Sequence, residues 1–394
     1  MFPPSVIFDD GPSSEGAWAL LLGMTVDGAC TFGIDEDFWY IDVKRILGKG
    51  GCVMKTIKGF RRGINLGGWL SQCKHEEAHY DSFILEEDIR TIASWGLDHV
   101  RLPVDYELIE TEGGVTKEDG YQYIDACLSW CKKHGLRMII DLHKTVGYSF
   151  NDAFGNANSL FLSEPMQDRF VGLWERIALR YAKEQDTVVF ELLNEIVEEE
   201  NSGPWNALAR RAVEAIRKYA PKTPVIIGGI QWNSVRGVGL LDSPYDENVV
   251  YTFHFYEPFA FTHQKAYWVA EMPKDFGIGY PATMEEYRRA YDIIGEKASQ
   301  IFRSGCAEMG AELLEAMFME AIEAAERKGA ALYCGEYGVI DQAPAADTVR
   351  WYRDMHRLFE KHGIGRAAWT YKEMDFGLTM AHYAGVREEL VGLL

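Results

Sequence analysis

The sequence predicts a (β/α)8 barrel, in which eight parallel strands alternate with helices around a closed cylinder. From residue 61 onward, β-rich apolar runs alternate with amphipathic helical patterns, as in a parallel barrel or a doubly wound sheet. Eight β-rich runs can be counted, which favours the barrel. Several of them end on polar or charged residues, at the rim where barrel enzymes carry their active sites.

The predicted strands share a high content of Val, Ile, Tyr and Phe. They are expected near residues 63–69, 98–104, 136–143, 188–195, 224–229, 249–256, 331–336 and 365–371. Helical apolar spacing predicts helices near residues 84–95, 121–134, 166–183, 205–219, 313–328 and 348–362. Glycine follows four of these helices, where a left-handed residue ends a helix, at Gly96, Gly135, Gly329 and Gly363.

Two stretches depart from the alternation. Residues 257–310 separate the sixth and seventh strands by far more than a usual connection and include an amphipathic portion over 284–302. We expect an inserted subdomain there, near the cleft, within a catalytic barrel over 54–394. Residues 1–53 lack helical periodicity, and we expect a short N-terminal extension of unassigned role, either a small β-structured piece or sequence upstream of the natural start.

Composition narrows the class of protein. Hydrophobic residues make up 47% of the 394, which excludes a disordered chain. The formal net charge is −20, a field that repels nucleic acid and anionic membranes and suits a neutral substrate. We therefore expect neither nucleic-acid nor membrane partners, and a monomer.

The cysteines and the N-terminal region suggest a compartment. Seven cysteines at scattered spacing argue against a disulfide framework, and Cys127 and Cys131 continue an apolar helical stripe, as core thiols do. The early apolar run 17–24 follows acidic residues and lacks a basic start, so no signal peptide is visible. A cytoplasmic location is expected, with export by another route left open.

Two glutamates, each closing a β-rich run, carry the functional prediction. Glu195 ends Val-Val-Phe-Glu-Leu-Leu-Asn-Glu over 188–195, and Glu336 lies in Ala-Leu-Tyr-Cys-Gly-Glu-Tyr-Gly over 331–338, where Cys334 is expected to share its direction. Two carboxyls on different strand ends are what glycoside hydrolysis requires: one protonates the leaving oxygen, and the other attacks the sugar or activates water. The pattern predicts a glycosidase.

The alternation of side chains along a strand also predicts the role of Glu191. It should point the same way as Glu195 but lie deeper in the barrel. An unpaired buried charge is costly, so Glu191 needs a partner such as Arg101 or His99. We expect a structural role for Glu191.

Other polar groups gather at the ends of predicted strands, namely Arg101, His143, His254, Tyr256 and Trp369. Their convergence on one rim predicts a site. A metal centre of His143, His254 and a glutamate is the alternative, but no two of these residues show ligand spacing on one element. We expect neither a metal nor a cofactor; no Gly-rich phosphate loop stands out.

The tryptophans divide into candidate sugar platforms and core residues. Trp369 is the best candidate for stacking under a sugar ring, because pyranose rings present apolar C–H faces to indole. Weaker candidates are Trp69, Trp205 and Trp232, whereas helix-face tryptophans are expected in the core, namely Trp95, Trp130 and Trp174.

The combined motifs resemble glycoside hydrolase family 5. Leu-Leu-Asn-Glu over 192–195 resembles its acid/base motif, and Cys-Gly-Glu-Tyr-Gly over 334–338 resembles its nucleophile motif. Within the family, the chain is similar to the clostridial endoglucanase C type. That similarity extends from residue 54 to the end and rests on the segments 63–69, 98–103, 253–256 and 261–266.

The resemblance implies a retaining enzyme. Glu195 would be the acid/base and Glu336 the nucleophile, with Asn194 on the 2-hydroxyl of the attacked sugar. The remaining site residues would support these three: Arg101 and Tyr256 beside Glu336, His143 and His254 in the polar shell, and Trp369 as the stacking floor. Opposed pKa shifts are expected, downward beside a guanidinium and upward in a dry site. Ile196 stands where many members have proline.

The substrate implied is a β-1,4-linked glucan of the cellulose or mixed-linkage type. The same barrel and carboxyls serve a mannanase, a β-1,3-glucanase or an exo-acting β-glucosidase, because the loops decide. A non-hydrolytic carbohydrate-binding barrel and a metal-dependent barrel hydrolase are the alternatives of a different class.

Overall fold

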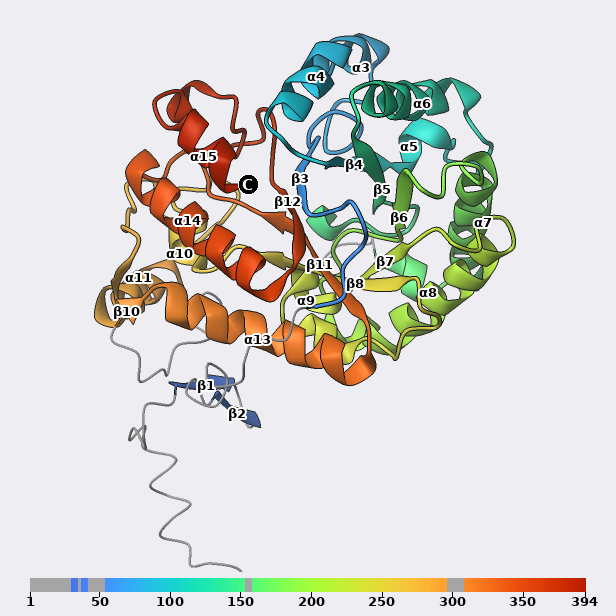
Figure 1. The fold of residues 1–394 in the computed structure, drawn as a ribbon. Coiled ribbons are helices and arrows are strands. Elements are labelled where there is room, and N and C mark those ends of the chain that lie inside the picture. Colours follow the sequence, from blue (N-terminus) through green and yellow to red (C-terminus); the bar gives the residue numbers. More distant parts are fainter. Residues whose placement is uncertain (1–29, 35–36, 42–53, 153–157, 296–307) are drawn as a thin grey trace, which may run out of the picture.

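A closed barrel of eight parallel strands forms the centre of the molecule (Figure 1). This computed structural model describes residues 30–34, 37–41, 54–152, 158–295 and 308–394, the first two ranges through their backbone alone. Around the barrel the strands follow one another in the order β3, β4, β5, β6, β7, β8, β11, β12, and β12 pairs with β3 to close it. The predicted (β/α)8 barrel is confirmed.

All eight predicted strands are present, several of them shorter than expected. The barrel consists of β3 (Arg62–Asn65), β4 (His99–Asp105), β5 (Arg137–Lys144), β6 (Val188–Glu191), β7 (Val225–Gly228), β8 (Val249–Phe255), β11 (Ala331–Tyr337) and β12 (Gly365–Ala368). The prediction extended the fourth strand to Glu195, but β6 ends at Glu191. Glu195 therefore lies on the loop beyond the strand, where strict side-chain alternation no longer holds.

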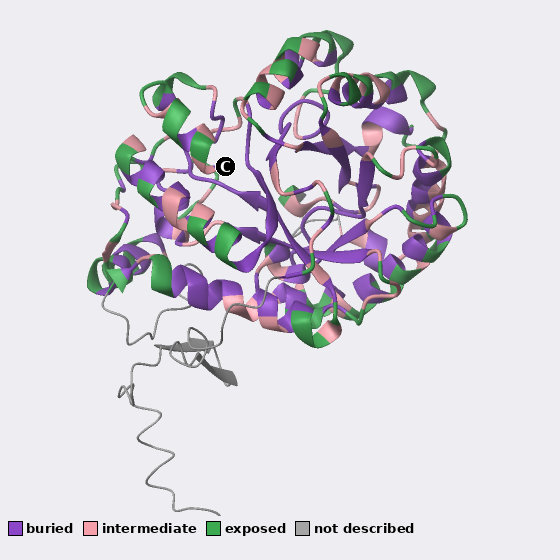
Figure 2. Ribbon diagram, in the orientation of Figure 1, coloured by how far each residue is buried: buried purple, intermediate pink, exposed green. Residues whose placement is uncertain are grey.

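The six predicted helices cover the outside of the barrel (Figure 1). They are α4 (Glu86–Ser94), α6 (Glu118–Lys133), α7 (Glu164–Arg180), α8 (Ser202–Arg217), α13 (Ala311–Lys328) and α14 (Ala345–His362). The predicted glycine stops are also found, since Gly96, Gly135, Gly329 and Gly363 all have positive φ. The inward faces of these helices and the strands are buried (Figure 2).

Shorter helices fill the loops. They are α3 (Glu77–Phe83), α5 (Tyr106–Ile109), α9 (Ile230–Asn233), α10 (Phe259–Thr262) and α15 (Arg387–Leu393), with one-turn helices η1 (Phe150–Asp152), η2 (Ser159–Phe161), η3 (Glu199–Asn201), η4 (Gly237–Leu240) and η5 (Ala381–Tyr383). Between β7 and β8 only α9 and η4 occur, so the fifth strand has no long covering helix.

The barrel interior changes from apolar to charged along its axis. Its floor is an apolar cluster to which six successive strands, β5 to β12, each contribute one side chain. These side chains are Ile139, Val189, Ile226, Val250, Tyr333 and Ala367, and Ile57 and Phe60 complete the cluster. Because side chains alternate, the residue two positions further along β5 and β6 faces the same interior, and these are Asp141 and Glu191. Above the apolar floor, the carboxyl groups of Asp141 and Glu191 therefore lie buried inside the barrel.

The two departures from the repeat are partly described. Within 257–310 lie α10, the two-residue strands β9 (Ala282–Thr283) and β10 (Glu308–Met309), and α11 (Met284–Ile294), which begins at a capping box of Thr283 and Glu286. The remainder of the amphipathic portion 284–302 lies outside the described residues from 296 onward. In the N-terminal region β1 (Cys30–Ile34) and β2 (Asp37–Ile41) form an antiparallel pair. No helix of the described ranges is both long and apolar enough for a bilayer crossing.

Candidate active site

Arg101, on β4, is the centre of the site. Its side chain is fully buried, and its three guanidinium nitrogens all bind side-chain oxygens. The guanidinium lies 2.7 and 2.9 Å from the two oxygens of Glu191, 2.8 Å from Glu336, 2.8 Å from Asn194, 2.9 Å from Asn65 and 3.0 Å from Asp141. Six oxygen atoms from five residues, which lie on or just after four strands, are thus held around one cation.

Glu336 is directed into the site by an irregularity in β11. The register with β8 shifts between Cys334 and Glu336, so the expected common direction of these two side chains is wrong. Gly335 sits at the shift, where its N–H donates to Thr252 and its carbonyl accepts from Asn65. Such irregularities re-aim side chains next to active sites. The carboxylate of Glu336 ends between Arg101 and Tyr256.

Glu195 reaches the same point from the loop after β6. Its Oε1 lies 2.7 Å from Nδ1 of His254, and that nitrogen lies 3.6 Å from Oε2 of Glu336. A carboxylate oxygen of Glu195 lies within 4.8 Å of one of Glu336. Carboxyl groups of retaining glycosidases lie about 5–5.5 Å apart, whereas those of inverting enzymes are separated by about 6.5–9.5 Å.

The two carboxyls differ in how strongly their surroundings favour the proton. Burial raises the pKa of Glu195 well above its usual value, and the charge of Glu336 adds to that. Burial also raises the pKa of Glu336, but Arg101, His143 and the Tyr256 hydroxyl act against it. The expected opposed shifts are therefore wrong in sign for Glu336, because desolvation outweighs the guanidinium. The two pKa values still differ, because Glu195 is shifted upward more strongly and so holds its proton more readily than Glu336.

Glu191 occupies the deeper position that its strand predicted. It is fully buried and pairs with Arg101 through both oxygens, while His99 instead bonds Asp98 and Tyr333. Burial raises the pKa of Glu191 to about 7, with Arg101 acting in the opposite direction. The paired, inward position fits the expected structural role.

His143 and Trp369 form one wall of the site. Their rings are stacked with centroids 5.8 Å apart and planes 10° from parallel. Nδ1 of His143 lies 2.6 Å from Asp141 and its Nε2 lies 2.7 Å from the Gln72 amide nitrogen. A carboxylate can only accept, so Nδ1 of His143 carries the proton and Nε2 accepts from Gln72.

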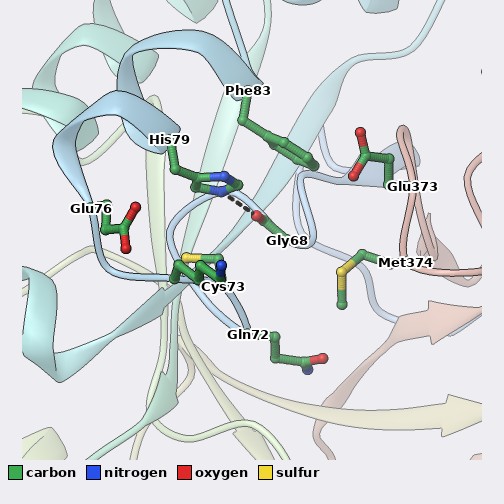
Figure 3. Close-up of a pocket in the computed structure, with 9 residues that line it drawn as sticks. Gly68, Gln72, Cys73, Glu76, His79, Phe83, Glu373 and Met374 are labelled. Carbon is green, nitrogen blue, oxygen red and sulfur yellow. Dashed lines mark hydrogen bonds between the residues drawn. The ribbon is translucent and has the colours of Figure 1, made fainter.

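A cavity of about 350 Å³ adjoins this wall (Figure 3). On one side Figure 3 shows His79 and Phe83 from α3, and on the other Glu373 and Met374 from the segment after β12. Gln72 belongs both to the cavity lining and to the His143 contact. Gln72 therefore connects the cavity lining to His143, whereas neither Glu195 nor Glu336 lines the cavity.

The weaker sugar-platform candidates separate clearly. Trp69 and Trp205 are fully buried and donate to backbone carbonyls of Tyr80 and Gly228, so a platform role is wrong for both: their indoles pack in the core. Trp232 is 48% exposed. The expected core position holds for Trp174, which is fully buried, while Trp95 and Trp130 pack against the core part-buried.

Four polar residues of the site were missed from the sequence, namely Asn65, Gln72, Asp141 and Asn233. Asp141 had a signal, since it lies two residues before His143 on one strand. Asn65 likewise ends the first strand, β3. Gln72, on a loop, and Asn233, at the end of the short helix α9, have left-handed φ of 54° and 52°, and no sequence pattern predicted either position.

The site also has a set of potential metal ligands. Glu195, His254 and Glu336 offer ligand atoms within 4.8 Å of one another. A second such set in the described residues is His75, Asp105 and Glu107. The expected alternative, with both histidines, does not form because His143 is engaged by Asp141 and Gln72.

Curated relatives span most of the chain. Cellodextrinase A of Ruminococcus flavefaciens is 42% identical over 314 residues, which cover 79% of this chain and 86% of the relative. Endoglucanase C of Acetivibrio thermocellus is 42% identical over 344 residues, covering 85% of this chain and 98% of the relative.

Solved structures have the same fold. The cellulose synthase subunit Z of Clostridioides difficile is 26% identical with a TM-score of 0.66, over 85% of this chain and 99% of that one. Cel5A of Thermotoga maritima, in complex with mannotriose, has a TM-score of 0.68 over 85% of this chain and 97% of that one; at 24% identity it supports the fold alone. The cellulase model, described as glycosyl hydrolase family 5, matches residues 62–375. Together with the 42% identical relatives, this match shows that the chain belongs to glycosyl hydrolase family 5, the cellulase family.

Proposed function

We propose that the protein hydrolyses β-1,4-glucosidic bonds with retention of anomeric configuration, using Glu336 as nucleophile and Glu195 as acid/base. The observation that carries the proposal is the placement of one carboxyl oxygen of Glu195 within 4.8 Å of one of Glu336. Oxygens this close favour direct attack by one carboxyl over the wider spacing that an inverting mechanism needs for its additional water.

The reaction has two steps. Ionised Glu336 attacks the anomeric carbon while protonated Glu195 gives its proton to the departing glycosidic oxygen, and a glycosyl ester on Glu336 results. Glu195, now ionised, then takes a proton from water as the water attacks the anomeric carbon and releases Glu336. Arg101 and Tyr256 hold the two oxygens of Glu336 at 2.8 Å each, so the nucleophile keeps one orientation through both steps.

Asn194 and Trp369 contact the sugar at the point of cleavage in this proposal. Arg101 occupies Oδ1 of Asn194, which leaves the amide nitrogen as the group that can reach the 2-hydroxyl. Trp369 provides the apolar floor, 7% exposed and backed by the parallel His143 ring.

An extended glucan is the substrate that the surroundings favour. A row of aromatic rings runs from Tyr256 through His263 and Phe376 to Trp268, with successive centroids 5.1 to 6.4 Å apart. Tyr267, 83% exposed, and Trp268, 46% exposed, end this row on the inserted segment 257–310. We propose that they support glucosyl units beyond the cleaved one, which suits endo action. The relatives' names, cellodextrinase and endoglucanase, do not decide chain length.

One time course tests the proposal. Proton NMR of the first products from a soluble cello-oligosaccharide should show the β-anomer before mutarotation; an initial α-anomer would exclude retention. Parallel rates on mixed-linkage glucan, mannan and laminarin should be highest on the first. Binding without release of reducing sugar would favour a carbohydrate-binding barrel, and loss of activity on chelation would favour the metal alternative at Glu195, His254 and Glu336.

A further inference from the structure

The turn that follows β7 is joined to both sides of Glu195. Gln231, Trp232 and Asn233 have φ of 56°, 55° and 52°, three successive left-handed residues in α9. The Trp232 N–H donates to the carbonyl of Ile196 at 3.0 Å, and the Asn233 amide donates to the carbonyl of Asn194 at 2.8 Å. The backbone carbonyls of the residues before and after Glu195, Asn194 and Ile196, are therefore both held by this turn. Such backbone strain persists only where the surroundings over-determine it, and it clusters at functional sites.

The Asn233 amide has one possible orientation. Its nitrogen faces the Asn194 carbonyl, which can only accept, so this atom must be the NH2 group. The same nitrogen lies 3.3 Å from Nε2 of His254. Oδ1, without a hydrogen-bond partner, points toward Gly228, where an added Cβ would come within 2.2 Å of it. Asn233 is fully buried, so no water competes for these groups.

The orientation of Asn233 decides where the proton of His254 sits. An NH2 group can only donate to Nε2, so Nε2 must be the unprotonated nitrogen and Nδ1 must carry the hydrogen. The Nδ1–H then donates to Oε1 of Glu195 at 2.7 Å. When Glu195 is protonated, its proton must sit on the other oxygen, Oε2.

We infer that Asn233 is a positioning residue that fixes His254 in the Nδ1-protonated form and thereby keeps the transferable proton of Glu195 on Oε2. This inference rests on the proposed acid/base role of Glu195. Neutrality of His254 supports it: burial, together with the charge of Arg101, holds the pKa of His254 well below its usual value, so the ring carries a single proton. The titratable and charged groups around His254 are Glu195, Glu336, Arg101 and His143.

The Asn233→Asp variant reverses the polarity of this contact while keeping a residue type that tolerates the left-handed conformation. A carboxylate cannot donate, so His254 must place a proton on Nε2. If the ring is neutral, its unprotonated Nδ1 accepts a hydrogen bond from protonated Glu195 and so engages the proton that should be transferred. If the ring is charged, the imidazolium lowers the pKa of Glu195.

Kinetics should show the loss of acid function. We expect kcat on cello-oligosaccharides to fall about 10²-fold, within the range for general acid catalysis, while aryl glycosides with good leaving groups lose far less. The basic limb of the kcat–pH profile should move to lower pH. The inference would be overturned if the basic limb stayed in place, or if it moved to higher pH because the introduced carboxylate repels ionised Glu195.

A spectroscopic readout is independent of turnover. Nitrogen-15 NMR of protein labelled at histidine, with His254 assigned by His254→Gln, should show the Nδ1–H form in the wild type. The signal should change to Nε2–H or imidazolium in Asn233→Asp. Finding Nε2–H in the wild type would refute the inference whatever the activity.

Two further variants separate positioning from folding. Gly228→Ala must displace the Asn233 amide and should reproduce the leaving-group dependence, whereas Gly239→Ala, whose Cβ would meet nothing within 4 Å, should not. Asn206 is the matched buried amide, bonded to Ser202 and Leu240, and Asn206→Asp should leave the pH profile unchanged. If Glu195→Ala itself shows no leaving-group dependence, the proposed function fails; if it does and Asn233→Asp does not, only this inference fails.

Discussion

Tyr256 donates its phenolic hydroxyl to Oε2 of Glu336 at 2.8 Å. This hydrogen bond favours the ionised carboxylate and opposes the upward effect of burial on the pKa of Glu336. Arg101 occupies the other oxygen. Glu336, the proposed nucleophile, is therefore oriented at both oxygens, by a phenol just after β8 and a guanidinium on β4.

Tyr256→Phe should raise the pKa of Glu336, because the charged form loses a donor. Attack requires ionised Glu336, so the acidic limb of the kcat/KM profile should move to higher pH, with the largest loss on the acidic side. A hydrogen bond to a charged group is worth about 1.5–3 kcal/mol, which predicts a loss of about 10- to 100-fold. Tyr287→Phe, which removes a hydroxyl bonded to the Gly279 carbonyl, is the control. An acidic limb that stays in place would contradict the role of Tyr256.

Glu336→Gln should abolish turnover on every glucan, with a loss of about 10⁴-fold or more, since loss of a nucleophile leaves only binding and polarisation. Reducing-sugar release and circular dichroism would be measured together, with the exposed Glu312→Gln as control. Residual activity near that of the wild type in folded Glu336→Gln would remove it as nucleophile.

Glu195→Ala should separate substrates by leaving group. Natural oligosaccharides need protonation and should be slowed about 10²- to 10⁴-fold. Aryl glycosides with acidic phenols should keep the first step, visible as a burst of phenol. Equal loss on both substrate types would show that Glu195 is not the acid.

Arg101→Met should destabilise the fold, because Glu191, Asp141 and Glu336 would lose the cation that they share. Removing one partner of a buried ion pair costs about 3–5 kcal/mol. Urea unfolding followed by tryptophan fluorescence would measure it. Arg90→Met removes an exposed cation paired with Glu87 and should cause no detectable change. An Arg101 variant as stable as the wild type would contradict the central role of this cation.

The same substitution should increase the pH dependence of stability. The folded pKa of Glu191, about 7, exceeds its unfolded value, so its contribution is fully present below about pH 4.5 and is lost as the pH rises through 7. Arg101 lowers that pKa, so the variant should lose more stability than the wild type between pH 5 and 8. A smaller loss would mean that Glu191 ionises without Arg101.

Trp268→Ala, alone and with Tyr267→Ala, should weaken long substrates selectively. An aromatic contact is worth about 0.5–1.5 kcal/mol, which predicts about a 2- to 10-fold rise in KM per ring on cellohexaose. Aryl cellobiosides, too short to reach these rings, should show little of that rise. Tyr219, 37% exposed just before β7 at the opposite end of the barrel, supplies the control Tyr219→Ala. Equal effects on short and long substrates would contradict the platform.

Local patterns carried most of the fold. The spacing of apolar residues along the sequence predicts eight strands and six helices. The four glycines that follow helices predict where those helices end, because a left-handed residue often ends a helix. These features depend on neighbours within a few positions. The over-extension of β6 to Glu195 shows the limit: strand pairing ends at Glu191, but Leu192 and Leu193 beyond it are still apolar and buried, as strand residues are.

The tryptophans show a second limit. Trp205 and Trp232 were equally plausible platforms by sequence, yet Trp205 lies on the buried face of α8 and Trp232 is half exposed. The sequence around an aromatic residue does not reveal whether elements distant in the chain will bury its ring.

By itself, the amino-acid order determined the barrel, its family and the glutamates at its rim, because strand period, caps and motif residues are local properties of the chain. Only the tertiary structure decided three features. The strand irregularity at Gly335 turns the Glu336 side chain into the site. Burial raises the pKa of Glu336 more than Arg101 lowers it, and Asn233 contacts His254. These depend on distances between segments far apart in sequence, and electrostatic and hydrogen-bond energies depend on those distances and on burial.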